Sequence, residues 1–336
     1  MKKIRLAIIG CGKVTEIFHL PAAASSEHLE VVALVDPYLP QARALATAHN
    51  VPVVEDDYRN ILGRVDAAIV ATPHHLHGSV ALGLLKEGIH VLVEKPMALN
   101  TAECDTMIKQ AERSGLVLSV GLLRRYYEAA AFVKIMLKNQ MLGSILNVDL
   151  REGSVFRWQS ASDFMFRKYG GGGVMVDAGI HLLDTMLWWF GEFEVTAYYD
   201  DAMGGVEANA EIQVVMANGS KGAVELSRTR NLRNTCIIQG DRGSLEIGSG
   251  VNPLVRLRMK DMQSFLGGQI IKNKMDKNNK DVFSRQIEDF VQAILNRKAP
   301  FVPGTEGRRS VEKLETCYAS KLQLHEPWMP VLKESL

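Results

Sequence analysis

The chain has 336 residues, of which 47% are hydrophobic and 23% are charged, and its formal net charge is +1. This length exceeds what one hydrophobic core usually supports, so we expect two domains. The small net charge argues against nucleic acid as a partner, because nucleic-acid binding needs a basic face that displaces counterions from phosphates. No stretch reaches the roughly 18 uninterrupted apolar residues of a membrane span, so no membrane partner is expected.

Cysteine usage and the N-terminus bear on the cellular compartment. The apolar stretch Leu6–Ile9, which follows three basic residues, is shorter than the roughly 7 to 15 apolar residues of a secretory signal. The cysteines are far apart and lack the close pairs of a zinc site or a redox motif. We therefore expect reduced thiols, no metal and a cytoplasmic protein. The four cysteines are Cys11, Cys104, Cys236 and Cys317.

Up to about residue 120, short β-branched runs alternate with amphipathic segments of helical length, which is the pattern of βαβ units in a parallel sheet. Strands are expected at Ile4–Ile9, Val31–Val35, Ala67–Ala71, His90–Val93 and Val117–Val120. Helices are expected at Lys13–Ala24, Pro40–His49, His77–Glu87 and Thr101–Ser114, the last with Thr101 as its N-cap. The pattern predicts an α/β fold whose first domain, residues 1–122, is a doubly wound Rossmann domain.

After Gly121 the strands no longer alternate with helices. Strand-like stretches are expected at Ile145–Leu150, Val195–Tyr199, Ala210–Met216, Gly222–Ser227, Thr235–Gln239 and Ser244–Ile247. Turn residues at 217–220 and 240–243 look like hairpin connections. Helices are expected at Tyr126–Lys138, Val282–Asn296 and Glu306–Leu324. Residues 123–336 are therefore predicted to form an α+β domain with an open, largely antiparallel sheet.

A glycine loop follows the first strand and opens the first helix. Gly10 makes the tight turn, and Gly12 lets the backbone approach a pyrophosphate that lies at the helix N-terminus with Lys13 and Val14. Unpaired N–H groups and the helix dipole favour negative charge at that place. Thr15 stands where such loops usually have a third glycine or alanine, so the packing of the helix on the strand must tolerate a larger side chain.

Asp36 ends the second strand, where a carboxylate accepts hydrogen bonds from the adenosine ribose of a bound dinucleotide. The alternative is a turn aspartate ahead of Pro37. A carboxylate at this position repels a 2′-phosphate, so NAD is expected as the cofactor, with NADP still possible. Two further motifs follow later strands and are expected to face the same edge of the sheet: Thr72, Pro73 and His77 after one, and Glu94 and Lys95 after the next. These five residues are candidates for cofactor contacts.

Asp177, His181 and Asp184 have the i, i+4 and i+7 spacing of residues on one face of a helix. Oxidation of an alcohol needs a base that takes the hydroxyl proton, and a neutral imidazole suits this work near pH 7. His181 is the candidate base, and its titration is expected near the ordinary value for histidine. Asp184 is expected either to bond the remote nitrogen of His181 or to serve in packing between the domains.

Together these motifs resemble the glucose-fructose oxidoreductase, inositol dehydrogenase and rhizopine-catabolism family, written Gfo/Idh/MocA. The motifs that carry the resemblance are the glycine loop, Glu94-Lys95-Pro96, Gly121, Arg124-Arg125-Tyr126, Gly171-Gly172-Gly173 and the D-x-G-x-H-x-x-D stretch from Asp177 to Asp184. The resemblance implies that Lys95 orients substrate and cofactor, that Asp177 holds substrate hydroxyls or tunes Lys95, and that His181 exchanges the proton. It also implies a homodimer or homotetramer formed through the open sheet face.

The residues between the first strand of the second domain and the Gly171 loop are where this family varies to choose substrates. Trp158 offers an aromatic face for a sugar ring, and Arg157 and Arg167 are able to pair with phosphate or carboxylate. The alternative is a solvated loop with interdomain ion pairs. Arg124 and Tyr126 at the domain junction are further candidates for substrate contacts.

These observations predict an NAD(P)-dependent dehydrogenase or ketoreductase of a sugar, polyol or sugar derivative. Two alternatives remain on the same fold. One is a glycosidase that uses bound NAD transiently with no net redox change, and the other is a ligand-sensing regulator without catalysis. The retention of Lys95, Asp177 and His181 argues against the regulator.

Overall fold

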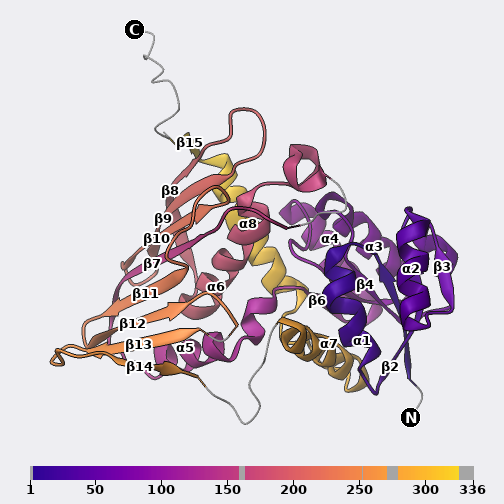
Figure 1. The fold of residues 1–336 in the computed structure, drawn as a ribbon, viewed down its shortest axis with the longest axis horizontal. Helices are drawn as coiled ribbons and strands as arrows, with labels where there is room; N and C mark the ends of the chain where they lie inside the picture. The colour runs from indigo at the N-terminus through magenta and orange to yellow at the C-terminus, as the bar shows by residue number, and fades with distance from the viewer. Residues whose placement is uncertain (1–2, 159–162, 252, 271–278, 325–336) are drawn as a thin grey trace, which may run out of the picture.

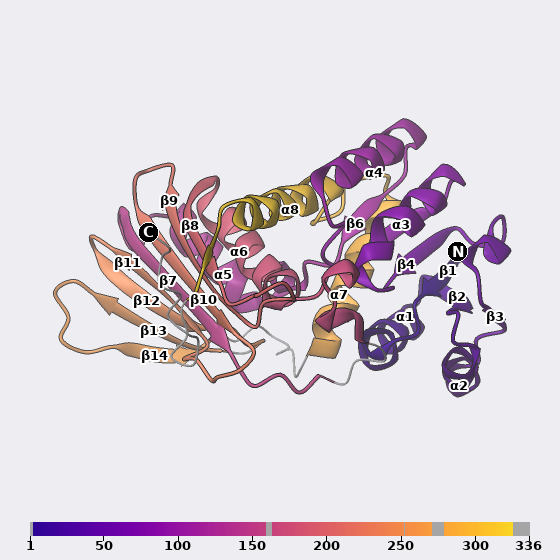
Figure 2. The same ribbon diagram turned by 90° about the horizontal axis from the view of Figure 1, so that it is seen from above.

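The computed structural model describes residues 3–158, 163–251, 253–270 and 279–324. Two β-sheets lie side by side, and helices fill the space between them (Figure 1). The smaller sheet belongs to the N-terminal part of the chain and the larger one to the C-terminal part, as the colour gradient in Figure 2 shows. No helix among the described residues is long and apolar enough to cross a membrane.

The first sheet has six parallel strands in the order β3-β2-β1-β4-β5-β6. The strands are β1 (Ile4–Ile9), β2 (Leu29–Val35), β3 (Val53–Glu55), β4 (Ala67–Val70), β5 (His90–Val93) and β6 (Leu118–Val120). This order confirms the doubly wound Rossmann domain, whose topological switch lies between β1 and β4. The sequence pattern missed β3, a three-residue edge strand whose side chains are only half-buried and so carry little hydrophobic signal.

Helices connect these strands, and the first of them begins with a π-helical turn. They are η1 (Thr15–His19), α1 (Leu20–Ala24), α2 (Leu39–His49), η2 (Tyr58–Ile61), η3 (His74–Leu76), α3 (His77–Lys86) and α4 (Thr101–Ser114). The expected cap of α4 was wrong by one residue. The side chain of Asn100 accepts the hydrogen bond from Glu103 N at 2.9 Å, so Asn100 is the N-cap and Thr101 is the first helical residue.

The second sheet has nine strands in the order β14-β13-β12-β11-β7-β10-β9-β8-β15. They are β7 (Ile145–Gly153), β8 (Phe193–Asp200), β9 (Asn209–Met216), β10 (Lys221–Ser227), β11 (Thr235–Gly240), β12 (Gly243–Gly248), β13 (Leu254–Met259), β14 (Leu266–Gln269) and β15 (Lys321–Gln323). Six of the eight pairings are antiparallel, while β10 with β7 and β15 with β8 run parallel. The predicted open, largely antiparallel sheet is confirmed, and both expected hairpins form.

The helices of this part are η4 (Leu123–Tyr126), α5 (Glu128–Lys138), η5 (Asp163–Phe166), η6 (Lys168–Gly170), η7 (Met175–Gly179), α6 (Ile180–Phe190), α7 (Asn279–Leu295) and α8 (Gly304–Ala319). Helices α5, α6 and α8 lie on the side of the large sheet that faces the first domain, and the other side carries no helix among the described residues (Figure 2). The expected helix to Leu324 was wrong at its end. It stops at Ala319, and the next residues extend the sheet as β15 beside β8.

Two C-terminal helices pack on the N-terminal domain. Val282, Phe283 and Phe290 of α7 are buried in the same hydrophobic cluster as β1 and α1. Helix α8 contacts α4 and β6, and the Val120 amide donates to Val302 O at 3.0 Å just before that helix. The two sheets are thus joined by packed helices as well as by the chain between β6 and α5, and this fixes the cleft that opens between them.

Candidate active site

A cleft of about 960 Å³ lies at the carboxyl ends of the parallel strands and extends to the second domain. The glycine loop after β1, Asp36 after β2, Thr72 after β4 and Lys95 after β5 all line it. Ligands bind at this edge in open α/β sheets. Its volume is at the upper end of the range for small-molecule sites, which suits a dinucleotide together with a substrate.

The glycine loop is held by close backbone packing. Gly10 has a φ of +98°, and a Cβ there would lie 2.3 Å from Ala71 O, so only glycine fits. A Cβ on Gly12 would meet nothing within 4 Å, because this residue faces the open cleft. The large residue at the third position is accommodated by a hydrogen bond, since buried Thr15 donates from Oγ1 to Gly10 O at 2.6 Å.

Asp36 fastens this loop to the end of β2. Its Oδ2 accepts from Cys11 N at 2.7 Å and its Oδ1 accepts from Tyr38 N at 2.8 Å, while the side chain still lines the cleft. Lys13 and Val14 also line the cleft, and the Lys13 ammonium pairs with Glu16 at 2.8 Å.

Thr72, Pro73 and His77 line the cleft at the end of β4. The buried Oγ1 of Thr72 has no hydrogen-bond partner in the described protein, as is expected of a group that awaits a ligand. His77 is fully buried between Pro96 O at 2.7 Å and Thr72 O at 2.8 Å, and burial lowers its pKa. It therefore links the loops after β4 and β5. The open side of Gly12 and the unpaired Thr72 hydroxyl both fit a dinucleotide in this cleft.

Glu94 forms a buried ion pair with a residue that the sequence analysis left aside. His19 Nε2 lies 2.8 Å from Glu94 Oε1, and Glu94 Oε2 accepts from the Lys95 amide at 3.1 Å. Burial opposes ionisation of Glu94, but the hydrogen bond and charge of His19 and the charge of Lys95 lower its pKa overall. His19 lies in the π-helical turn η1, 75 residues away in sequence, and only the fold brings the two together.

Lys95 and Asp177 meet in the cleft, at the junction of the two domains. Lys95 Nζ donates to Asp177 O at 2.8 Å and to Asp177 Oδ1 at 2.9 Å. Arg228, which follows β10, donates from Nη2 to Asp177 Oδ2 at 2.8 Å. Burial favours the neutral acid, but the charges of Lys95 and Arg228 outweigh it and hold the pKa of Asp177 well below its usual range. One carboxylate is thus shared between two cations.

His181 is half-buried and lines the same cleft. Its Nδ1 is buried and has no partner, whereas Nε2 is neither hydrogen-bonded nor buried and is open to the cleft. Burial and the charges of Lys95 and Arg124 lower the pKa of His181 well below 6.5, against the opposing effect of Asp177. The imidazole is therefore neutral at pH 7, with a basic nitrogen available to a ligand.

Asp184 lies apart from this group. The chain enters α6 through the π-helical turn η7, and beyond it Asp177 and His181 face the cleft while Asp184 does not. Its Oδ1 accepts from Arg125 Nη2 at 2.6 Å and from Ser310 Oγ at 3.1 Å, and the side chain is 1% exposed. Of the two roles expected for Asp184, the contact with His181 does not occur among the described residues, and its partners Arg125 and Ser310 belong, like Asp184, to the second domain.

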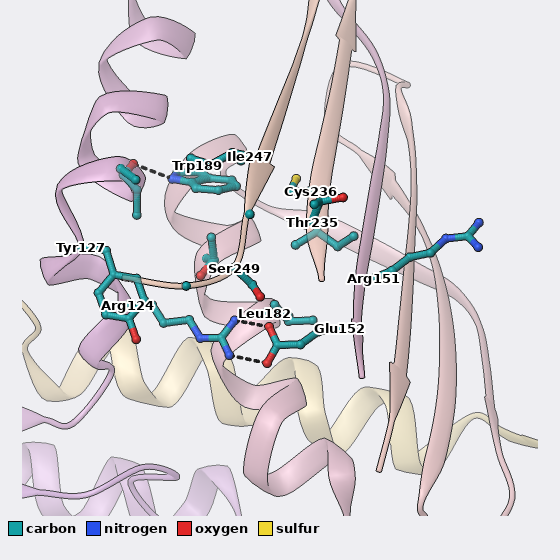
Figure 3. Close-up of a pocket in the computed structure, with 16 residues that line it drawn as sticks. Arg124, Tyr127, Arg151, Glu152, Leu182, Trp189, Thr235, Cys236, Ile247 and Ser249 are labelled. Atoms are coloured by element: carbon teal, nitrogen blue, oxygen red, sulfur yellow. Dashed lines mark hydrogen bonds and ion pairs between the residues drawn. The ribbon is translucent and has the colours of Figure 1, made fainter. Parts of the chain in front are cut away.

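Arg124 and Tyr126 do not line the cleft either. Arg124 forms a bidentate pair with Glu152 at 2.7 and 2.6 Å beside a separate cavity of about 40 Å³, as Figure 3 shows. Glu152 lines both spaces, so the pair separates them. Tyr126 OH donates to Asp289 Oδ2 at 3.0 Å on α7. Their position at the domain junction, which suggested substrate contacts, serves the joint between domains.

Two of the three candidate substrate residues between β7 and Gly171 line the cleft. Arg157 and Trp158 line the cleft, and the Trp158 ring stacks on Phe18 of η1 with 6.5 Å between centroids. Arg167 is exposed, pairs with Asp163 at 2.5 Å and is absent from the cleft wall. The two arginines of this loop region therefore do not face the same space.

Arg228 is the cleft residue in contact with Asp177 that sequence reasoning missed. It lies beyond β10 within no recognisable motif, and the only signal was its place after a strand that pairs with β7. No group of three or more metal-ligating side chains occurs among the described residues.

A glycine loop, an aspartate at the end of β2 and a histidine beside a lysine–aspartate pair, all in one cleft, are typical of dinucleotide-binding oxidoreductases. The comparisons with known proteins agree. Residues 4–122 match the model of the oxidoreductase family with an NAD-binding Rossmann fold, and residues 134–331 match its C-terminal alpha/beta domain. The chain belongs to this family, Gfo/Idh/MocA.

Curated relatives act on sugars and polyols by name. The chain is 24% identical over 326 residues to scyllo-inositol 2-dehydrogenase (NAD(+)) of Bacillus subtilis, with 92% of each chain covered. It is 32% identical to D-glucoside 3-dehydrogenase of Escherichia coli over 193 residues, which are 56% of this chain and 54% of that one. Among solved structures, a 3-ketoreductase from Actinomadura kijaniata in complex with NADP matches with a TM-score of 0.85 at 20% identity, covering 97% of this chain and 100% of that one. This last likeness supports the fold.

Proposed function

We propose that the chain transfers a hydride between NAD and a hydroxyl-bearing carbon of a sugar, polyol or sugar derivative. The observation that carries the proposal is the convergence of Lys95, Asp177 and His181 in the cleft that holds the glycine loop. Gly10, Gly12, Asp36 and Thr72 are the residues that would hold the dinucleotide. When bound, the nicotinamide ring accepts the hydride from the alcohol carbon.

In the oxidation direction, His181 takes the hydroxyl proton. Its open Nε2 and its lowered pKa make it a neutral acceptor at pH 7. Lys95 uses two of its three N–H donors on Asp177, so one remains for the oxygen of the reacting carbon, where negative charge develops. Asp177 fixes the ammonium in that position. In reduction the same groups act in reverse, with His181 returning the proton to the new hydroxyl.

The test is a screen of polyols, neutral sugars, uronates and sugar nucleotides with NAD, followed through NADH absorbance. We expect stoichiometric NADH with at least one class. His181→Ala is expected to lose about 10²- to 10⁴-fold in rate while keeping NAD affinity. Glycoside cleavage without net NADH would assign the NAD-dependent glycosidase instead, and ligand binding with no turnover in either direction would assign the sensing regulator.

We infer that NAD is preferred over NADP because Asp36 lines the cleft beside the glycine loop. Asp36→Ala is expected to weaken NAD by about 1.5 to 3 kcal/mol, as for lost hydrogen bonds to a charged group, and to narrow the difference between the cofactors. Calorimetric titration of both cofactors measures this. Tighter binding of NADP by the unmodified protein would contradict the assignment.

We further propose a homodimer or homotetramer that forms through the helix-free face of the second sheet. This face carries charged side chains in register, such as the Asp149–Arg151 and Arg151–Glu225 pairs at 3.1 and 3.2 Å, which a second copy related by symmetry is able to continue. Light scattering would reveal the assembly.

The four cysteines are free and buried, which supports a reducing, cytoplasmic location.

A further inference from the structure

The guanidinium of Arg228 lies in the wall of the cleft and is held in place by its contacts. The residue follows β10, and its amide donates to Ala208 O at 2.8 Å, which fixes the backbone. Its side chain is only 9% exposed. Asp177 holds it on one side, and the ring of Phe156 lies 4.7 Å from its Cζ on another. A cation over an aromatic face is both oriented and stabilised, so this guanidinium has a defined position.

Most of its donors have no acceptor. A guanidinium has five N–H groups, and among the described residues only Asp177 accepts a hydrogen bond from the Arg228 side chain. Nε is buried without a partner, and Nη1 is unbonded but open to the cleft that the residue lines. Buried cationic donors are normally satisfied in native proteins, because leaving one unpaired is costly. The free donors therefore point to a ligand that supplies oxygen atoms.

The charges around Arg228 indicate which kind of ligand oxygen would bind there. Lys95 and Arg228 share the single carboxylate of Asp177. The two other acidic side chains at this end of the cleft are engaged elsewhere, Glu94 by His19 and Glu152 by the bidentate Arg124. Lys95 and Arg228 thus contact one carboxylate between them, and an anionic group is the complement that fits the donors of Arg228 that remain.

We propose that Arg228 binds an oxyanion on the substrate, a carboxylate or a phosphate, so that the enzyme acts on an acidic sugar or polyol derivative. This inference rests on the proposed function and names its substrate class. The planar fork of an arginine matches such a group through two parallel hydrogen bonds. Binding there places the anion next to Lys95 and His181, and the hydroxyl-bearing carbon of the same molecule then lies within their reach.

The kinetic test uses sugars that share the glucose ring and differ in the group at C6: glucose, glucuronate and glucose 6-phosphate, each with NAD. We expect the unmodified protein to have the lower KM for an anionic member, and the carboxylate and phosphate arms identify which anion fits. Arg228→Gln is expected to raise that KM by about 10- to 100-fold more than it raises the KM for glucose, so that the ratio between the two substrates changes, and Arg228→Lys is expected to recover part of the loss. Arg113→Gln, at the exposed end of α4, is the matched control and should behave as the parent.

A binding measurement accompanies the kinetics. Calorimetric titration of glucuronate or glucose 6-phosphate into the protein saturated with NADH should give heat that is lost in Arg228→Gln and kept in Arg113→Gln. A variant that loses kcat equally for all three sugars at unchanged KM would mean that Arg228 only holds Asp177, and this would overturn the proposal. A preference for the neutral sugar would overturn it as well. Absence of NADH with every substrate would instead count against the proposed function, while the titrations would still report on the anion site.

Discussion

At the scale of single residues, the titration of His181 is the property that most directly links structure to rate. The sequence analysis expected an ionisation near the ordinary value for histidine. The structure lowers the pKa of His181 well below 6.5, through burial first and then through the charges of Lys95 and Arg124. Oxidation needs the neutral ring, so kcat/KM should already be at its plateau at pH 6.5 and should fall only in more acidic solution.

Removing one of those charges should move the acid limb of the profile. Arg124→Gln is expected to raise the pKa of His181 towards 6.5, and the loss of rate on acidification should then begin at higher pH. The measurement is the pH dependence of kcat/KM with protiated and deuterated substrate, since an isotope effect identifies the profile of hydride transfer itself. An unchanged profile in both Arg124→Gln and His181→Ala would show that another group is the base, with Lys95 the next candidate.

At the scale of elements, the loop between β1 and η1 contains two glycines with different roles. We expect Gly10 to matter for the stability of the fold and Gly12 to matter for the binding of NAD. Gly10→Ala meets Ala71 O at 2.3 Å in a left-handed conformation and should destabilise the protein by about 2 to 5 kcal/mol. Gly12→Ala meets nothing and should leave the thermal unfolding temperature unchanged while it weakens NAD. Thermal unfolding and NAD calorimetry on the two variants form the test. Equal losses of stability would contradict this division.

The start of the helix that carries Asp177 and His181 is held by a buried carboxylate. Glu207 Oε1 accepts from Met175 N and from Tyr318 OH, both at 2.9 Å. Burial raises the pKa of Glu207 above 4.5, so the folded protein binds this proton more tightly than the unfolded chain. The stability that this proton contributes is complete below pH 4.5 and is lost as the pH rises through the folded pKa. Above pH 4.5 the folded protein must therefore either retain this proton or bury a negative charge, and both cost free energy.

Two substitutions of Glu207 should consequently have different effects on the free energy of unfolding at pH 7. Glu207→Ala removes both hydrogen bonds and should cost about 1 to 3 kcal/mol. Glu207→Gln keeps an acceptor oxygen without the charge, so at pH 7 it should be at least as stable as the parent. That advantage should shrink as the pH falls towards 4.5. Chemical denaturation at several pH values measures both effects. A glutamine variant that is destabilised as strongly as the alanine variant would show that the charge itself is needed.

The same elements show what the sequence was able to predict. Five of the six parallel strands were clear because they contain buried apolar runs, while the half-buried edge strand β3 was missed, and the glycine loop, Asp36 and Lys95 then followed from strand ends. The spacing of Asp177, His181 and Asp184 assumed a regular helix, but the chain enters α6 through a π-helical turn, and Asp184 pairs with Arg125 instead. Strand β13 does carry an apolar/polar alternation from Val255 to Met259, which the sequence reading overlooked, whereas β14 is fully exposed, contains two glycines and has no such period.

At the scale of the whole molecule, the site depends on contacts that no local pattern encodes. Arg228 reaches Asp177 across 51 residues, and His19 reaches Glu94 across 75. The first pair joins the end of β10 to η7, whereas the second forms within the N-terminal domain, between η1 and the end of β5. Arg125 also makes long-range contacts, since it bonds Asp184 of α6 and Glu306 of α8 and so joins three segments at the domain junction. Sequence motifs located the groups that carry chemistry, whereas the charges that tune them came from the tertiary fold.

Helix α7 makes the N-terminal domain depend on the C-terminal part of the chain, and this leads to the last prediction. Phe290 is fully buried in the cluster that contains β1 and α1, so Phe290→Ala should cost about 3 to 5 kcal/mol. Because α7 packs on the domain that binds NAD, the protein should still unfold in one calorimetric transition, and saturating NAD should shift that whole transition upwards. Phe265, 56% exposed beyond β13, provides the matched control, for which Phe265→Ala should change stability by no more than about 0.5 kcal/mol. Two separate unfolding transitions in Phe290→Ala, with only one of them responding to NAD, would show that the N-terminal domain is stably folded without the packing of α7.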